Sequence, residues 1–293
     1  MILITGATGT IGSEIVRMLV ARGEGVRAVT RNPETADFHG GVEFVRGDYS
    51  DIQAIADAMD GVDAVFVLSV LGPEGADVDT ALVKAASDAG ARRIVKLSAI
   101  GTGDPALGRV GTWHLPGEQA VRAGGTDWTI LRPSSFASNT LSWAPALHAG
   151  QSISNLTGSG AQGVVDPRDV SAVAVEALLS PVHAGCVYTL TGPELLTTRD
   201  QAAVVAAALG RPVEVADIDE AVARAHMLAA GATPDFADGA LAGQAFARAG
   251  GNAVLTDDIR QVLGRPPRTY AAWVTDHVAA FTAAPTAAGW RSY

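Results

Sequence analysis

The chain has 293 residues, of which 48% are hydrophobic and 18% are charged, so it is long enough to bury a large core. A net charge of -10 argues against general binding to nucleic acid and against docking on anionic membranes. The single cysteine, Cys186, excludes an intrachain disulfide framework, and the scattered histidines predict no metal site. We expect a cytoplasmic protein, because no signal peptide is evident and no apolar run approaches the roughly 18 residues that span a bilayer.

The first half of the chain alternates between two kinds of pattern. Short β-branched runs predict strands at residues 1–5, 26–30, 42–45, 64–68, 93–97 and 128–131. Apolar residues at helical spacing predict helices between them, at residues 11–22, 51–59, 79–89 and 116–123. Strands that alternate with helices form βαβ units and a parallel sheet. We therefore expect an α/β fold with a Rossmann-type, doubly wound dinucleotide-binding core in residues 1–132.

The rhythm changes after this core, and residues 133–293 predict a smaller, mainly helical substrate-binding cap. This cap is expected to be interleaved with the last core elements. Residues 134–163 are rich in Ser, Gly, Asn and Trp and predict a long irregular segment over a cleft. Further on, we expect a strand at 186–190, helices at 169–179, 198–209, 256–264 and 270–281, and broken helix in 219–251.

The strongest motif is a glycine-rich turn between the first strand and the first helix. It is formed by Thr5, Gly6, Ala7, Thr8, Gly9, Thr10, Ile11 and Gly12. Gly6 permits a tight turn, Gly9 lets the backbone approach a pyrophosphate, and Gly12 lets the helix pack close to the strand. The phosphate would then bind the free N–H groups of the helix N-terminus. The alternative is a tight strand–helix turn without a ligand.

The end of the second strand predicts which dinucleotide binds. NAD sites normally place Asp or Glu there to hold the ribose 2′-hydroxyl. Here the strand leads into Arg31, whose guanidinium can form a fork on a 2′-phosphate. The sequence therefore favours NADPH over NADH, with a solvated surface arginine as the alternative.

Three further residues are candidates for cofactor contacts because they follow strands. Asp48 comes after the third strand and could bind the adenine amino group, or it could instead form an Asx-turn before the next helix. Leu68 and Ser69 end the fourth strand, at the carboxyl edge where ligands bind in such sheets.

Several segments together resemble a known family. They are the glycine-rich turn, Arg31-Asn32-Pro33, Gly47-Asp48, Lys96-Leu97-Ser98 and Ile130-Leu131-Arg132-Pro133. They resemble the NmrA-like, atypical short-chain dehydrogenase/reductase proteins, and within these the NAD(P)H:quinone oxidoreductase and triphenylmethane reductase branch. The resemblance runs through almost the whole chain, including residues 166–169, 188–193 and 264–267.

The sequence departs from the wider superfamily at the usual Tyr-x-x-x-Lys pair. His114 and Glu118 stand at the corresponding positions, and the quinone-reductase branch shows a similar pattern. His114 could donate a proton to a developing hydroquinone oxygen, or it could cap a turn. Glu118 is a second catalytic candidate, but it could simply complement the helix dipole. Ser98 resembles the active-site serine of the superfamily, and a capping role is the alternative.

The resemblance also implies contacts near the nicotinamide and the substrate. Pro133 and Phe136 follow the sixth strand, where family members touch the nicotinamide, and Lys96 is a further cofactor-binding candidate. Trp113, Phe136 and Trp143 could form an apolar wall for a flat aromatic substrate, or they could be ordinary packing residues. The loop 101–111 has the polar character of a lid.

The resemblance therefore implies an NADPH-dependent reductase that transfers hydride to a quinone or related aromatic electrophile. A place in secondary metabolism, as a tailoring enzyme, is a more specific form of the same hypothesis. The alternative is a non-catalytic NAD(P)-binding redox sensor of the NmrA type, which the missing Tyr and Lys also fit. The expected partner is a small aromatic molecule, and a homodimer is one of the assemblies that the sequence allows.

Overall fold

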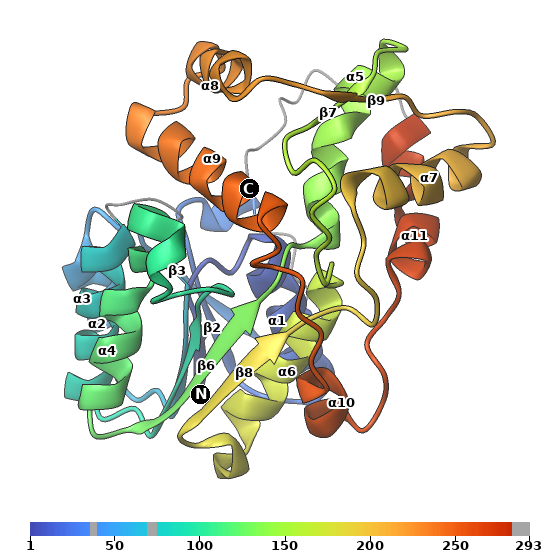
Figure 1. Cartoon of the computed structure of the whole chain (residues 1–293). Coiled ribbons are helices and arrows are strands. Elements are labelled where there is room, and N and C mark those ends of the chain that lie inside the picture. The colour runs from blue at the N-terminus through green and yellow to red at the C-terminus, as the bar shows by residue number, and fades with distance from the viewer. Residues whose placement is uncertain (36–39, 69–74, 283–293) are drawn as a thin grey trace.

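A computed structural model describes residues 1–35, 40–68 and 75–282 (Figure 1). Its centre is a seven-stranded parallel sheet in the order β3-β2-β1-β4-β5-β6-β8. The strands are β1 (Ile2–Ile4), β2 (Val26–Thr30), β3 (Val42–Arg46), β4 (Ala64–Val67), β5 (Arg93–Leu97), β6 (Asp127–Pro133) and β8 (Cys186–Leu190). The order reverses between β1 and β4, which creates the switch point where doubly wound sheets bind ligands. The expected Rossmann-type fold is confirmed.

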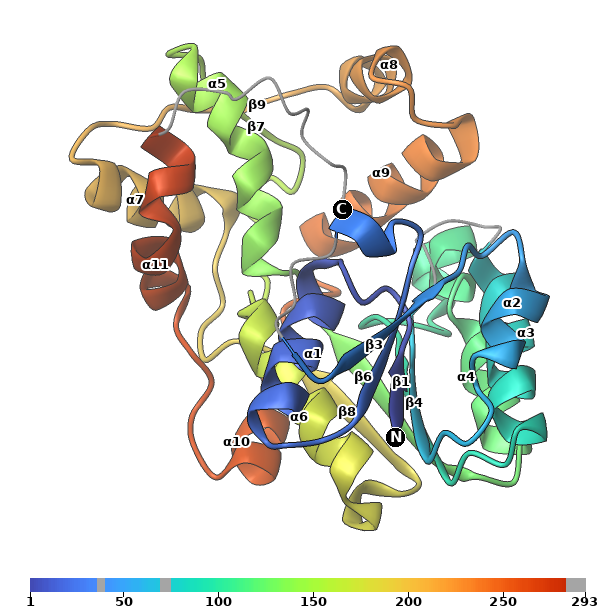
Figure 2. The ribbon, with the colours of Figure 1, turned by 180° about the vertical axis from the view of Figure 1, so that it is seen from behind.

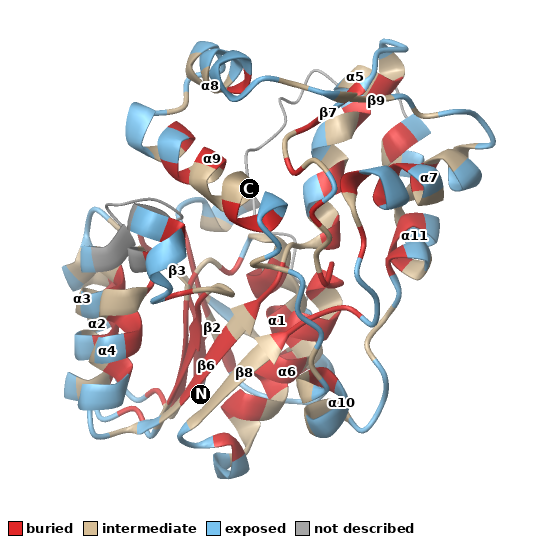
Figure 3. Cartoon of the chain, in the orientation of Figure 1, coloured by how far each residue is buried: buried red, intermediate tan, exposed pale blue. Residues whose placement is uncertain are grey.

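Helices cover both faces of the sheet. One layer holds α1 (Thr10–Ala21), α6 (Pro167–Leu179) and α10 (Asp258–Leu263), and the other holds α2 (Ile52–Asp57), α3 (Gly75–Asp88) and α4 (Leu115–Ala123). Successive strand residues point to opposite faces, so Val95 and Leu97 pack in the first core and Ile94 packs in the second. Lys96 therefore faces α3 and α4. Figure 3 shows the inward faces of these helices as buried.

Eight of the other elements form the cap. They are η3 (Ala137–Trp143), α5 (Ala144–His148), β7 (Ile153–Asn155), α7 (Thr198–Leu209), β9 (Val215–Asp217), α8 (Glu220–Ala229), α9 (Pro234–Arg248) and α11 (Tyr270–Thr282). A third core, built around Tyr270 and Trp273, joins η3, α5, α7 and α11. Figures 1 and 2 place α5, α7 and α11 on the α1 and α6 side of the sheet, and α8 and α9 on the opposite side.

The prediction that residues 134–163 are irregular is wrong in part. It contains η3, α5 and β7, and β7 pairs in parallel with β9. Each of these strands has three residues, so neither shows a readable alternation and their pairing depends on long-range contact. Residues beyond 132 also belong to the core, because β8 completes the sheet and α6 and α10 cover one of its faces. The domain boundary at residue 132 stays a prediction.

Local signals located other elements well. Thr197 and Asp200 form a capping box at the start of α7, and Gly210 ends this helix in the left-handed conformation.

None of the helices in the described ranges combines the length and apolar character that a bilayer crossing requires.

Candidate active site

The glycine-rich turn joins β1 to α1 at the switch point of the sheet. Gly6 has a φ of 61°, and Gly9 is the N-cap of α1 without any side-chain capping bond. The first turn of α1 also carries no acidic side chain, so its N–H groups and positive dipole are available to an anion. A Cβ on Gly12 would lie 2.2 Å from the Gly6 carbonyl oxygen, which confirms the close packing expected there. These residues fit a dinucleotide pyrophosphate.

Leu68 and Tyr49 pack beside this turn. Thr5 Oγ1 bonds the backbone after β4, accepting from Leu68 N at 2.8 Å, and the Tyr49 hydroxyl donates to the Leu68 carbonyl. A Cβ on Gly6 would lie 3.2 Å from Leu68 Cδ2 and 3.6 Å from the Tyr49 hydroxyl. Burial raises the pKa of Tyr49 to about 12, so it stays a neutral donor. Sequence reasoning missed Tyr49, and the predicted contact Ser69 lies outside the described residues.

Arg31 lies exposed at the carboxyl end of β2, as a 2′-phosphate ligand requires. Among the described residues its guanidinium has no ion-pair partner. Arg46, at the end of β3, donates to the Arg31 carbonyl at 3.0 Å and pairs with Glu34 at 2.9 Å. Sequence reasoning missed this second arginine, because only strand pairing brings it beside Arg31.

Asp48 adopts the turn that was its alternative interpretation. Its Oδ1 accepts from Ser50 N at 2.9 Å, and its carbonyl accepts from Asp51 N at 2.8 Å. The bond from the Ser50 backbone lowers the pKa of the Asp48 carboxyl. The side chain is nevertheless exposed, so an adenine contact stays a prediction.

His114 precedes α4 and belongs to a buried group with Lys96 and Asp79. Lys96 Nζ lies 2.8 Å from Asp79 Oδ2 and 3.4 Å from His114 Nδ1. The same His114 nitrogen is 3.7 Å from Asp79 Oδ2. Lys96 and Asp79 are fully buried, and the His114 side chain keeps 8% of its surface exposed. Lys96 faces Asp79 and His114, and its predicted contact with the dinucleotide stays a prediction.

Burial governs the charges of this group. It lowers the pKa of the Lys96 ammonium despite Asp79, and it lowers the pKa of His114. Burial alone would raise the pKa of Asp79, but the neighbouring His114 and Lys96 outweigh it, and the net shift is downward. His114 is therefore held neutral beside an ion pair.

Glu118, one turn further along α4, is held by a different set of partners. Arg132 Nε and Nη2 bind its two carboxylate oxygens at 2.8 and 2.6 Å, and Ser98 Oγ donates to Oε1 at 2.6 Å. Thr102 Oγ1 lies 3.1 Å from Ser98 Oγ. Both carboxylate oxygens of Glu118 are thus bonded to Arg132, one of them also to Ser98, and a catalytic role of Glu118 stays a prediction. Ser98 orients this carboxylate, and its contact with nicotinamide or substrate stays a prediction.

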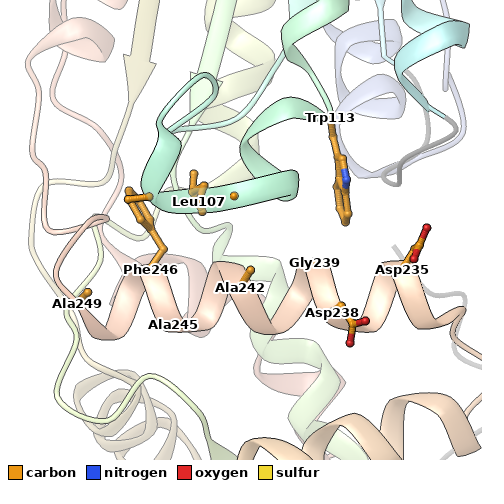
Figure 4. A pocket seen from close by; sticks show the side chains of 11 residues that line it. Leu107, Trp113, Asp235, Asp238, Gly239, Ala242, Ala245, Phe246 and Ala249 are labelled. Atoms are coloured by element: carbon orange, nitrogen blue, oxygen red, sulfur yellow. The ribbon is translucent and has the colours of Figure 1, made fainter.

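A cavity of about 500 Å³ lies between η2 (Pro105–Thr112) and α9 (Figure 4). Leu107 and Trp113 line one side, and small residues of α9, among them Gly239 and Ala242, line the other. The Trp113 ring stacks on Phe236 with centroids 6.4 Å apart. This volume and its apolar lining suit a flat ligand.

Residues 6–181 match the model of a family described as NAD(P)H-binding. The chain belongs to the NAD(P)H-binding family. The match begins within the glycine-rich turn and runs through β6 and α6. Family membership therefore agrees with the cradle that the structure shows at Gly9 and Gly12.

Similar proteins extend this result over nearly the whole chain. A (4-alkanoyl-5-oxo-2,5-dihydrofuran-3-yl)methyl phosphate reductase of Streptomyces griseus is 39% identical, over 96% of this chain and 99% of its own length. An NAD(P)H azoreductase of Xenophilus azovorans is 35% identical, over 97% and 100%. The NADPH-dependent quinone oxidoreductase QOR2 of Escherichia coli, complexed with NADPH, is 27% identical with a TM-score of 0.83, over 94% and 99%. The resemblance to the quinone-reductase branch of NmrA-like proteins is confirmed.

The three residues predicted to form an aromatic wall pack in different parts of the structure. Trp113 lines the cavity, whereas Trp143 packs against the cap core and Phe136 against the core under α1. Only Trp113 of the three is among the residues that line this cavity, and a shared contact with substrate stays a prediction. Pro133 is buried at the end of β6, and its carbonyl accepts from Ile100 N at 2.9 Å.

The loop 101–111 carries part of η2 and packs against α9, and its motion as a lid stays a prediction. Within the described part of the chain, no cluster of three or more His, Cys, Asp or Glu side chains could hold a metal ion.

Proposed function

We propose that this chain is an NADPH-dependent reductase that transfers hydride to a quinone or a related conjugated electrophile. The observation that carries the proposal is the place of His114. Its ring is buried except for 8% of the side chain, it follows Trp113 of the apolar cavity, and its Nε2 has no hydrogen-bond partner among the described residues. His114 directly follows the cavity residue Trp113 in the chain, and we infer that its free ring nitrogen reaches an acceptor oxygen bound there.

The cofactor would be held by the glycine-rich turn and by Arg31. The N–H groups of the first turn of α1 would bind the pyrophosphate, and Arg31 would bind the 2′-phosphate, which NADH lacks. When bound, the reduced nicotinamide supplies a hydride to the acceptor. The protein's own contribution is then to orient the acceptor, exclude water and supply one proton.

His114 Nε2 would donate a hydrogen bond to the oxygen that gains negative charge as the acceptor carbon is reduced, and a proton passed on to this oxygen would be replaced from solvent, because the neutral ring carries only one. In total, one acceptor, one NADPH and one proton react to give one reduced acceptor and one NADP⁺. A quinone or enone is already electrophilic, so positioning supplies much of the rate and a strong protein acid is not required.

The similar proteins support this substrate class. Their names give a furanone phosphate, an azo compound and a quinone as the molecules they reduce. The first two have conjugated acceptor bonds, and a quinone is a conjugated dicarbonyl. We infer that this chain reduces an acceptor of the same electronic kind. A cytoplasmic location and a homodimer stay predictions from the sequence.

The test is NADPH oxidation by the purified protein with a small quinone, an enone and an azo dye. Arg31→Ala should raise KM for NADPH by roughly 10- to 100-fold, as expected for loss of a charged hydrogen bond, and leave KM for NADH unchanged. Arg17→Ala is the matched control, because Arg17 is an exposed arginine of α1 whose ion-pair partner, within the described part of the chain, is Glu14. NADPH binding without turnover of any acceptor would instead favour the redox-sensor alternative.

A further inference from the structure

The ion pair between Lys96 and Asp79 is an unusual feature for the interior of this sheet. Both side chains are fully buried, and Asp79 Oδ1 has no hydrogen-bond partner among the described residues. Replacing a buried ion pair by apolar residues is often neutral or stabilising, so such a pair is weak evidence for stability. This pair therefore points to a role beyond holding the fold together.

The ion pair lies directly beside His114. Lys96 comes from β5, Asp79 from α3 and His114 from the residue before α4, so three elements meet here. A Cβ on Gly117 would lie 2.8 Å from the Asp79 carboxylate and 3.0 Å from Lys96 Cε. Glycine at this position is what allows α4 to lie directly on the ion pair.

Each contact restricts the proton positions on the imidazole. Lys96 Nζ donates to the Leu97 carbonyl and lies 3.4 Å from His114 Nδ1. An ammonium carries only donors, so this contact favours a lone pair on Nδ1 and the ring proton on Nε2. Asp79 Oδ2, at 3.7 Å from Nδ1, would instead favour a proton on Nδ1. It lies nearer to Lys96 Nζ, at 2.8 Å. Glu118 also faces the group from α4, and its charge is balanced by Arg132 of β6.

We propose that Lys96 and Asp79 are positioning residues that keep His114 a neutral imidazole with its proton on Nε2, the nitrogen left free for an acceptor. Asp79 holds the ammonium in place, and the ammonium holds Nδ1. Burial of the ring acts in the same direction, since it lowers the pKa of His114. The inference rests on the proposed function only for the identity of the acceptor.

The direct test is nitrogen NMR of the full-length protein labelled with ¹⁵N-histidine. The chain has six histidines, and the signals of His114 are those that disappear from the spectrum of His114→Gln. We expect a single ring proton on Nε2, and no titration over the pH range in which free histidine titrates. A doubly protonated ring at neutral pH, or a proton on Nδ1, would overturn the inference without reference to activity.

Variants separate the two positioning residues from general structural effects. In Lys96→Met, Asp79 becomes the nearest charge, so the ring proton should move to Nδ1 or the ring should begin to titrate in the range of free histidine. Lys96→Met/Asp79→Leu keeps the site apolar if the single variant does not fold, and it should lose the preference for Nε2. Lys84→Met removes an exposed lysine of α3 and should leave the His114 signal unchanged. An unchanged signal in both Lys96 variants would overturn the inference.

Kinetics then connect the tautomer to the reaction. Loss of the correctly placed proton should lower kcat of Lys96→Met by roughly 10²-fold and leave KM for NADPH unchanged. An equal rise in KM would indicate a structural role only. If NMR shows the Nε2 proton but the wild type reduces no acceptor, the proposed function fails and the positioning of His114 stands.

Discussion

Arg132 binds both carboxylate oxygens of Glu118, with Nε 2.8 Å from Oε1 and Nη2 2.6 Å from Oε2. The arginine comes from β6 and the glutamate from α4, so the pair fastens this helix to the sheet. Only 2% of the Glu118 side chain is exposed, against 26% for Arg132. The carboxylate therefore depends on its partners more than the guanidinium does.

Arg132→Met should lower the free energy of unfolding by about 3 kcal/mol, because it leaves a buried carboxylate without its main partner. Urea unfolding at neutral pH measures the change. Arg92→Met is the control, since Arg92 is 68% exposed in its pair with Asp63 and its loss should cost less than about 1 kcal/mol. Equal effects of the two substitutions would contradict the structural role of Arg132.

The same pair predicts a dependence of stability on pH. Burial alone would raise the pKa of Glu118, but the bonds from Arg132 and Ser98 outweigh it and bring the pKa below its ordinary value of 4.5. A carboxyl with a lowered pKa in the fold stabilises it above the unfolded pKa, and this contribution disappears as the pH falls through the folded pKa. The difference in unfolding free energy between wild type and Arg132→Met should therefore shrink below pH 4.5. A constant difference in acid would show that the lost energy is not electrostatic.

Gly12→Ala should damage both the fold and cofactor binding. Its Cβ would lie 2.2 Å from the Gly6 carbonyl oxygen, so α1 must move away from the turn that precedes it. We expect a loss of about 2 kcal/mol of stability and at least tenfold weaker NADPH binding, measured by cofactor fluorescence. In Gly243→Ala, on α9, the new Cβ meets no atom within 4 Å, and this variant should bind NADPH as the wild type does. Normal binding by Gly12→Ala would contradict the proposed phosphate cradle.

Ala242→Leu should test whether the cavity beside Trp113 receives the acceptor. The added side chain would enter the cavity from α9, opposite Leu107. We expect KM to rise about tenfold for a polycyclic quinone and to stay unchanged for a one-ring quinone, because the loss is steric. Ala225→Leu, at an exposed position of α8, should affect neither acceptor. Equal KM values for both quinones in Ala242→Leu would place the acceptor elsewhere.

Much of the fold could be predicted because its signals are local. The bounds expected for β2, β5 and β8 agree with the structure, since β-branched runs bordered by turn residues suffice to mark these strands. The cap was harder to predict. β7 and β9 are each three residues long, and nothing in either segment alone indicates the partner that makes it a strand.

The candidate site divides in the same way. The glycine-rich turn was predictable because Gly6, Gly9 and Gly12 act within one βα unit. His114 and Ser98 were recognised as candidates, but their partners were not. The bonds from Arg132 to Glu118 could not be predicted, because only folding brings the glutamate of α4 against β6.

The sequence by itself determined the parallel dinucleotide-binding sheet, the phosphate turn and the exposed arginine that suits NADPH. Each depends on residues close together in the chain, whose spacing dictates backbone geometry directly. Folding decided the charge state and the partners of His114, because Asp79 and Lys96 reach it from α3 and β5. Burial then changes how strongly these groups hold their protons, and burial is a property of packed elements rather than of any one segment.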